Sequence, residues 1–240
     1  MKVVKIQSRC FIKEAVGNIK SILREDELMW FTNHPQFKHL FHMHLEKRNK
    51  VQGMWMLFLH AVITEKKREA WFVINGVPIR YSLKEHGILS GLYCHNYPAD
   101  YMSTLGGNQF MTKTFKAGSV ICYEMVRDKF LSMRNKPSRG NARLQMAVLY
   151  FLSSVIRGNA KKADKKTQTG APSVDQFFLQ AVDDLDMCQW FPWGRYSFDQ
   201  NLDEMQRLFK SFKDKVFVYD PKKPKNWAYP CFNIPLQVNE

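Results

Sequence analysis

Two short runs of apolar, mostly β-branched and aromatic residues flank an Asn-Gly pair in the first half of the chain. Residues 71–74 precede Asn75-Gly76, and residues 77–81 follow it. An Asn-Gly pair favours the positive φ angles of a two-residue turn, so the pattern predicts a β-hairpin. Pro78 has no N–H to donate to a neighbouring strand. The second arm is therefore predicted to lie at the edge of a sheet or to pair with a neighbour on one side only.

The four residues from Ser82 to Glu85 directly follow this hairpin and have the pattern of a capping box. The Ser82 side chain accepts from the N–H of Glu85, and the Glu85 carboxylate accepts from the N–H of Ser82. Gly91 suits the left-handed conformation that ends many helices. We therefore predict a helix over residues 83–90. Because a hairpin of this size is marginal alone, it must pack on helices elsewhere in the chain.

Apolar residues recur at helical spacing in several other stretches. The predicted helices cover residues 11–30, a stretch that starts near Pro35, residues 53–64, residues 119–133, residues 142–157, a stretch after a capping box at Ser173, and residues 198–212. The run over 53–64 is apolar nearly all round, as in a central buried helix. Residues 95–118 lose the pattern and are predicted to form a loop, and residues 216–219 form a short strand-like run. The expected fold is a predominantly α-helical α+β class, a single globular domain with one small β-hairpin around Asn75-Gly76.

Composition and charge indicate what kind of protein this is and which partners it favours. The chain has 240 residues, 45% of them hydrophobic, and a formal net charge of +14. This hydrophobic content indicates a folded core, and the charge favours acidic partners such as nucleic acid or acidic protein. No apolar run reaches the length of a membrane span, and the first residues do not resemble a secretory signal. We expect an intracellular, nuclear protein that binds protein or nucleic acid and does not contact a membrane.

Two stretches of the chain resemble the plant family called domain of unknown function nineteen eighty-five. The first lies within residues 71–94, and its matching positions are Trp71, Phe72, Asn75, Gly76, Pro78, Ile79, Arg80, Ser82, Leu83, Glu85, Gly91, Leu92 and Cys94. The second lies within residues 182–198, and its matching positions are Val182, Asp183, Asp184, Leu185, Pro192, Trp193, Gly194, Arg195, Ser197 and Phe198. A fainter similarity is to the plant mobile domain, a transposase-associated module.

The resemblance implies a transposon-derived plant protein, in which such domains often precede a SUMO-protease-like domain. It covers residues 33–212. We therefore divide the chain into a helical lead-in over 1–32, a family-like globular domain over 33–212 and a basic C-terminal tail over 213–240. The tail departs from the family pattern, which implies either a truncated or a divergent end. The family brings no established chemistry to the chain.

Candidate catalytic and metal-binding groups lack the geometry that such sites need. Asp183, Asp184 and Asp186 are near neighbours on one predicted helix, where adjacent side chains point about 100° apart and cannot converge on one ion. The histidines around residue 40 lack the spacing of a zinc-binding helix. Cys94 is followed by His95, but no third group orients that pair. We expect no enzymatic activity, no cofactor, no bound metal and no small-molecule substrate.

Candidate binding residues fall into two groups. Asp183, Asp184, Trp193 and Arg195 lie with Trp190 around a Pro-Trp-Gly turn. An exposed cluster of aromatic and arginine side chains there would suit protein binding or the stacking of single-stranded bases. In the alternative interpretation, Trp193 packs beneath the turn and Arg195 pairs with Asp183 or Asp184.

The second group consists of basic residues suited to phosphate contact. Its members are Arg134, Lys136, Arg139, Arg143, Lys161 and Lys162. The lysine-rich segment containing Lys161 and Lys162 can equally be a solvated loop or a nuclear localisation signal. We therefore expect a non-catalytic interaction module of a transposon-related protein. The alternative is a basic nucleic-acid-binding domain of a transposase accessory protein.

Overall fold

The computed structural model describes most of the predicted globular region. The described residues are 5–8, 10–42, 61–64, 68–74, 76–101, 107, 109–116, 118–138, 140–158, 173–213, 226–229 and 232. The helices are α1 (Ile12–Ile22), α2 (Glu25–Thr32), α3 (Lys38–His42), α5 (Leu83–Ser90), α6 (Gln109–Thr114), α7 (Tyr123–Leu131), α8 (Ala142–Phe151), the π-helix η2 (Leu152–Ile156), α9 (Gln176–Ala181), α10 (Leu185–Trp190) and α11 (Trp193–Lys213). The strands are β1 (Lys5–Ser8), β2 (Ala61–Thr64), β3 (Glu69–Ile74), β4 (Val77–Tyr81) and β5 (Asn226–Tyr229). The predicted class, mainly helical with a small β-hairpin, is confirmed.

The helical core is built around α8 and η2, which contact α1 and α7. Eight of the ten residues of α8 and all five residues of η2 are buried. A helix buried on nearly every side is expected to be mostly apolar, and the exceptions in α8 and η2 are Arg143, Gln145, Ser153 and Ser154. In η2 the Ser153 hydroxyl donates to the Leu149 carbonyl and the Ser154 hydroxyl to the Tyr150 carbonyl. These bonds satisfy the buried hydroxyls within the helix itself.

The predicted hairpin is present as β3 and β4, joined across residues 75 and 76. Ile74 lies opposite Val77, and Gly76 has a φ angle of 80°. Residues that flank a two-residue turn exchange both backbone hydrogen bonds, so Pro78 turns its nitrogen away from β3. The strand order is β2-β3-β4, which places β4 at the edge of this sheet as the sequence predicted.

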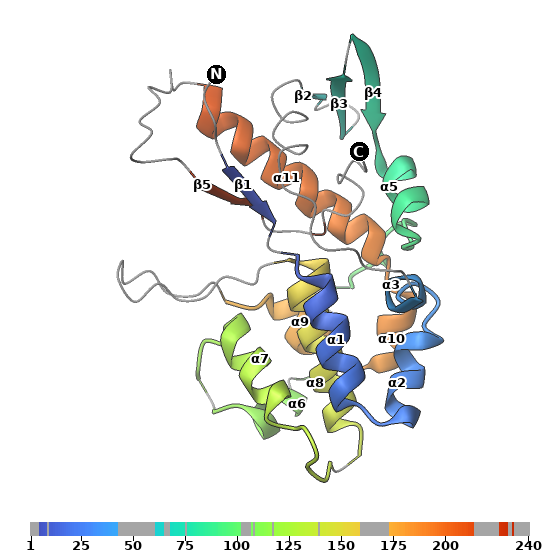
Figure 1. The fold of residues 1–240 in the computed structure, drawn as a ribbon, viewed down its shortest axis with the longest axis vertical. Coiled ribbons are helices and arrows are strands. Elements are labelled where there is room, and N and C mark those ends of the chain that lie inside the picture. Colours follow the sequence, from blue (N-terminus) through green and yellow to red (C-terminus); the bar gives the residue numbers. More distant parts are fainter. Residues whose placement is uncertain are drawn as a thin grey trace.

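The predicted capped helix is also confirmed. In α5 the N–H of Ser82 donates to Glu85 Oε2 at 2.9 Å, and Gly91 follows the helix with a φ angle of 69°. Burial favours a raised pKa for Glu85, but hydrogen bonds from Ser82 and Arg80 outweigh it and hold the pKa at about 2. In Figure 1, α11 runs diagonally between the β1–β5 pair and the unit formed by the hairpin and α5.

The helix predicted over residues 11–30 is two helices. Leu23 is extended, with φ −72° and ψ 148°, and it separates α1 from α2. The N–H of Arg24 then donates to Glu27 Oε2 at 3.0 Å, which satisfies a free donor at the start of α2. This break lets Phe31 of α2 enter the core, where it is fully buried.

The helix predicted over residues 53–64 is wrong at its end. Residues 61–64 form strand β2, which pairs antiparallel with β3 and places Ala61 opposite Phe72. An apolar run without periodic polar positions fits a buried strand as well as a buried helix. Residues 53–60 lie outside the described part of the chain.

Other predicted elements need smaller corrections. The helices predicted over 119–133, 142–157 and 198–212 are present as α7, as α8 with η2, and as α11, with shifted ends. The predicted loop over 95–118 contains α6. The predicted capping box at Ser173 is wrong, because Asp175 caps α9 by accepting from the N–H of Phe177 at 3.0 Å. The strand-like run over 216–219 lies outside the described residues.

One feature of the fold joins the two ends of the chain. Strand β1 pairs with β5 in parallel, with Lys5 opposite Asn226 and Ser8 opposite Tyr229. The prediction of a single hairpin did not include this pair. None of the described helices is both long and apolar enough to cross a membrane.

Candidate functional site

The two signature stretches, about 90 residues apart in sequence, meet at the start of α11. The N–H groups of Gly194 and Arg195 both donate to the carbonyl of Tyr93, at 2.9 and 3.2 Å. This contact requires a glycine, because a Cβ on Gly194 would lie 2.6 Å from Cys94 Sγ and 2.8 Å from the Tyr93 oxygen. The first signature therefore packs directly against the second.

A buried polar network links the same stretches. His86 of α5 lies between the Tyr81 hydroxyl, 2.6 Å from Nδ1, and the Ser197 hydroxyl, 2.8 Å from Nε2. Asn201 donates to the Tyr81 oxygen at 3.2 Å and to the carbonyl of Phe232 at 2.8 Å. These bonds tie β4, α5 and α11 to one another and to the C-terminal segment.

The serine–histidine pair in this network has the spacing of a nucleophile and its base, but it is enclosed. His86 and Ser197 are both fully buried. Burial lowers the pKa of His86 to about 3, so its imidazole is neutral at physiological pH. The Ser197 hydroxyl also bonds with the carbonyl of Gly194 at 3.1 Å. The network therefore supports packing between elements, as buried hydrogen-bonded polar groups do.

Arg195 does not pair with Asp183 or Asp184, so that part of the alternative interpretation is wrong. Its other part, the packing of Trp193 beneath the turn, agrees with the full burial of Trp193. The Arg195 guanidinium donates to the carbonyls of His95 at 2.6 Å and Cys94 at 3.2 Å. It also donates to the side-chain oxygen of Asn96 at 3.1 Å. These three bonds fix the segment after α5, which is the role we assign to this arginine.

Trp193 cannot belong to an exposed aromatic surface, because it is fully buried. Its Nε1 donates to the carbonyl of Cys188 at 2.7 Å, and its ring lies 4.6 Å from that of Phe191. Trp190 is the exposed tryptophan of this turn, at 63% exposure. Its ring stacks with that of Tyr93, with centroids 6.3 Å apart and planes inclined by 19°.

The two aspartates of the candidate interaction site act as helix caps. The carboxylate of Asp183 accepts from the N–H groups of Gln109 and Phe110, each at 2.8 Å, and so caps α6. Asp184 accepts from the N–H of Met187 at 2.9 Å and caps α10. Each cap satisfies backbone donors that a helix start leaves free. Among the described residues, no group of three or more His, Cys, Asp or Glu side chains could hold a metal ion.

The predicted phosphate-contacting residues differ in how exposed they are. Arg134 and Lys136 are exposed on the turn between α7 and α8. Arg143 is not available to a partner, because its side chain is only 3% exposed and pairs with Glu27 at 2.8 Å. Arg139, Lys161 and Lys162 lie outside the described residues. Among the described members of this basic group, Arg134 and Lys136 are therefore accessible to a partner and Arg143 is not.

A groove of about 970 Å³ lies beside the basic turn. Its walls come from α6, the end of α7, the start of α8 and the turn between α9 and α10. Lys113 and Lys129 line it from α6 and α7, and Asp183 and Asp184 line it from the turn between α9 and α10. The sequence analysis did not single out either lysine, because they are far apart in sequence and no local motif contains them.

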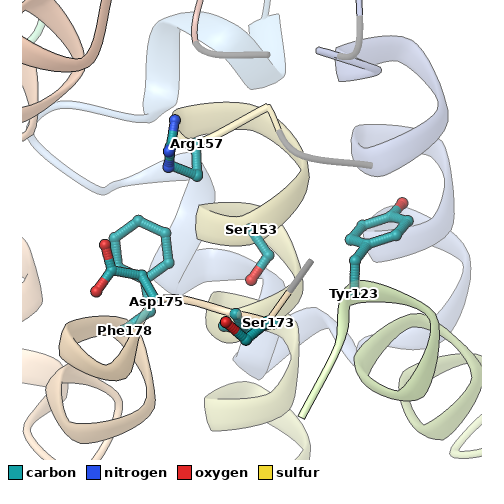
Figure 2. A pocket seen from close by; sticks show the side chains of 7 residues that line it. Tyr123, Ser153, Arg157, Ser173, Asp175 and Phe178 are labelled. Carbon is teal, nitrogen blue, oxygen red and sulfur yellow. The ribbon is translucent and has the colours of Figure 1, made fainter. Parts of the chain in front are cut away.

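A second, smaller cavity of about 130 Å³ lies between η2, the start of α7 and the start of α9. Figure 2 shows the side chains of Ser153, Arg157 and Asp175 around it. Both carboxylate oxygens of Asp175 are engaged, one by the N–H of Phe177 and the other by the Tyr196 hydroxyl at 2.5 Å. The carboxylate of Asp175 is therefore used in holding the start of α9 and in binding α11.

Comparisons with known proteins support the resemblance in both signatures. Residues 58–204 match the model of the family described as Domain of unknown function (DUF1985). The chain is also 33% identical to the uncharacterized protein At3g43530 of Arabidopsis thaliana over 227 residues, which are 93% of this chain. The match spans 27% of that relative's own length. No solved structure matches the chain.

Proposed function

The chain belongs to the DUF1985 family, and we propose that it serves as a non-catalytic module that binds another protein. The observation that carries this proposal is the exposed Trp190 stacked on Tyr93. Tryptophan is enriched among the residues that dominate binding energy at protein interfaces. A tryptophan at 63% exposure leaves much of its apolar surface in water, and a partner would cover it.

The burial and hydrogen bonds of the signature residues support a binding role over a catalytic one. His86 and Ser197 are buried together, Arg195 bonds with main-chain carbonyls, and Asp183 and Asp184 cap helices. A reaction needs groups that can reach a substrate. These polar groups shared with the family are engaged by other parts of the chain, while Trp190 beside them is exposed and stacks on the half-buried Tyr93.

The family resemblance and the net charge of +14 extend the proposal. We propose that the module works in the nucleus, within a longer transposon-related plant protein. A basic net charge favours acidic partners there. The matched Arabidopsis protein is much longer than this chain, so the activity of any full-length protein is part of the proposal.

The test compares baits that differ only at the surface. Purified wild-type chain, Trp190→Ala and Met29→Ala are immobilised and exposed to plant nuclear extract, and retained proteins are identified by mass spectrometry. Met29 is a matched control, because it is 53% exposed but lies on α2. We expect Trp190→Ala to lose proteins that wild type and Met29→Ala both retain. Identical sets on all three baits would refute the Trp190 surface.

A second candidate function is nucleic-acid binding, which the exposed Arg134 and Lys136 favour. Phosphate contacts make affinity fall steeply with salt, and each lost contact reduces the slope by about one. Titration of labelled DNA and RNA at rising salt, with wild type and an Arg134→Ala/Lys136→Ala double variant, tests it. Equal slopes for the two proteins would count against this role.

A further inference from the structure

We propose that Ser138, on the turn between α7 and α8, is a phosphorylation site whose phosphate binds at the start of α8. This role goes beyond both functions proposed above and depends on neither. Ser138 is half-buried, and the four residues before it on the turn are all exposed. A protein kinase can therefore reach this turn without unfolding a helix or a strand.

The Ser138 side chain already lies where an anion would be stabilised. Its hydroxyl oxygen accepts from the N–H of Arg143 at 3.2 Å, in the first turn of α8. Asn141, the residue just before this helix, makes no side-chain capping bond. The helix has ten residues, and the start of a helix carries free N–H groups and a partial positive charge. A phosphate on Ser138 would therefore meet both donors and a favourable charge.

A buried cation lies against the same turn. The Arg143 side chain is 3% exposed, and its Nη1 donates to the carbonyl of Lys136 at 2.9 Å. Its Nε pairs with Glu27, whereas its buried Nη2 has no hydrogen-bond partner among the described residues. A buried charged donor without an acceptor costs free energy. The turn therefore holds an unused guanidinium donor, and guanidinium groups bind phosphate strongly.

The exposed charges of the turn are also positive. Arg134 donates to the Ser21 hydroxyl at 2.9 Å, and Lys136 has no ion pair with any described residue. Together with Arg143 and Glu27, the described charges on the turn or bonded to it are three positive and one negative. The groove beside the turn adds two lysines and two aspartates, whose charges cancel. A phosphoserine carries about −1.5 to −2, so it would bring this turn close to neutrality.

Two other serines at helix ends lack this combination. Ser132 is exposed, but its hydroxyl donates to the carbonyl of Lys129 at the end of α7. A phosphate there would face the negative end of a helix and its free carbonyls. Ser82 caps α5, but its hydroxyl also contacts the carboxylate of Glu85, which would repel a phosphate. The geometry therefore favours Ser138 over both.

The modification needs a protein kinase and ATP. The terminal phosphoryl group of ATP moves to Ser138 Oγ. The bond from its phosphorus to the bridging oxygen of ADP breaks, a phosphorus–Oγ bond forms, and the serine proton passes to the carboxylate base of the kinase. Arg134 and Lys136 precede the serine by four and two positions, which favours a kinase with an acidic substrate groove.

The first measurement is phosphoryl transfer to the purified full chain. A purified serine kinase that selects basic residues before its target is supplied with ATP labelled on the terminal phosphate, and mass spectrometry locates the modified residue. We expect one phosphoryl group on Ser138. Ser138→Ala should remove most of the label, whereas the control Ser132→Ala should keep it. A chain that takes up no label, or equal uptake by Ser138→Ala, would overturn the assignment of this site.

The second measurement compares the Tm of the chain before and after phosphorylation by calorimetry. We expect a rise of about 2–4 °C, because the phosphate meets the start of α8 and its cations. Ser138→Asp should likewise have a higher Tm than the neutral isostere Ser138→Asn, by a margin that shrinks at high salt.

The matched control for this second measurement is the pair Ser132→Asp and Ser132→Asn at the end of α7. There the charged variant should have the lower Tm, because the carboxylate faces helix carbonyls. A phosphorylated chain that is no more stable than the unmodified one would overturn the binding of the phosphate to α8. Equal Asp–Asn differences at the two serines would do the same, because the effect would then not depend on the start of that helix.

Discussion

Replacing Gly194 by alanine should be among the most damaging single-methyl changes in this chain. Its Cβ would lie 2.6 Å from Cys94 Sγ, 2.8 Å from the Tyr93 oxygen and 2.9 Å from the Leu92 oxygen. Two of these neighbours are backbone atoms, and contacts under 3.0 Å require something to move. The Tyr93 carbonyl is held in place because it accepts from the N–H groups of Gly194 and Arg195.

The expected loss of stability in Gly194→Ala is large because the atoms around the added Cβ cannot easily move away. Overpacking a well-filled site costs typically 1–3 kcal/mol, and we expect about 3 kcal/mol here because the guanidinium of Arg195 also fixes the segment. For a chain of this size that loss lowers Tm by about 6–12 °C. Urea unfolding followed by circular dichroism measures the free energy of unfolding, and calorimetry measures Tm.

Gly17→Ala provides the matched control. Gly17 lies inside α1, and a Cβ there would meet nothing within 4 Å. Alanine favours a helix over glycine by about 1 kcal/mol, so this variant should be slightly more stable than wild type. Adding Cys94→Ala to Gly194→Ala should restore only part of the loss, because the two carbonyl contacts remain. A Gly194→Ala protein within about 0.5 kcal/mol of wild type would refute the reasoning.

Three further predictions concern buried charge and the sheet edge. Burial lowers the pKa of His34 and His86 from 6.5 to about 3. Between about pH 6.5 and pH 3 the unfolded chain therefore binds more protons than the folded chain. As the pH is lowered through this range, the free energy of unfolding should fall by up to about 1.4 kcal/mol per pH unit for each histidine, and urea unfolding at several pH values measures this. Glu27→Ala leaves the Arg143 guanidinium buried without its ion partner and should cost about 3–5 kcal/mol in the same assay; a loss under about 1 kcal/mol would contradict this. Pro78→Val adds an N–H donor to the outer edge of β4 and should promote self-association by strand pairing, detectable by analytical ultracentrifugation; a monomer at all concentrations would contradict it.

The stretch from β3 to Gly91 could be predicted because its signals are local. An Asn-Gly pair sets the turn, Ser82 and Glu85 cap the helix across three residues, and Gly91 ends it. Each interaction joins residues close in sequence, so neighbouring side chains are enough to specify it. The central helix α8 was predicted for a similar reason, because its apolar positions recur within a few turns.

The sequence predictions were wrong or incomplete where contacts between residues far apart in the chain determine the structure. Residues 61–64 are apolar enough for a helix or a strand, and pairing with β3 makes them β2. The β1–β5 pair joins residues more than 200 positions apart, and neither four-residue segment has a distinctive pattern. The burial of Arg143 likewise depends on Glu27, which lies on α2.

The candidate site shows the same division. The sequence by itself determined that two signatures are present and that an aromatic turn lies in the second. It could not decide which tryptophan is exposed, because residues three apart share a face only on a continuous helix. Phe191 is extended, with ψ 138°, so α10 ends before Pro192 and α11 begins at Trp193. Only the tertiary structure sends Trp193 into the core and leaves Trp190 on the surface, because the free energy of burying an aromatic ring depends on which helices pack over it.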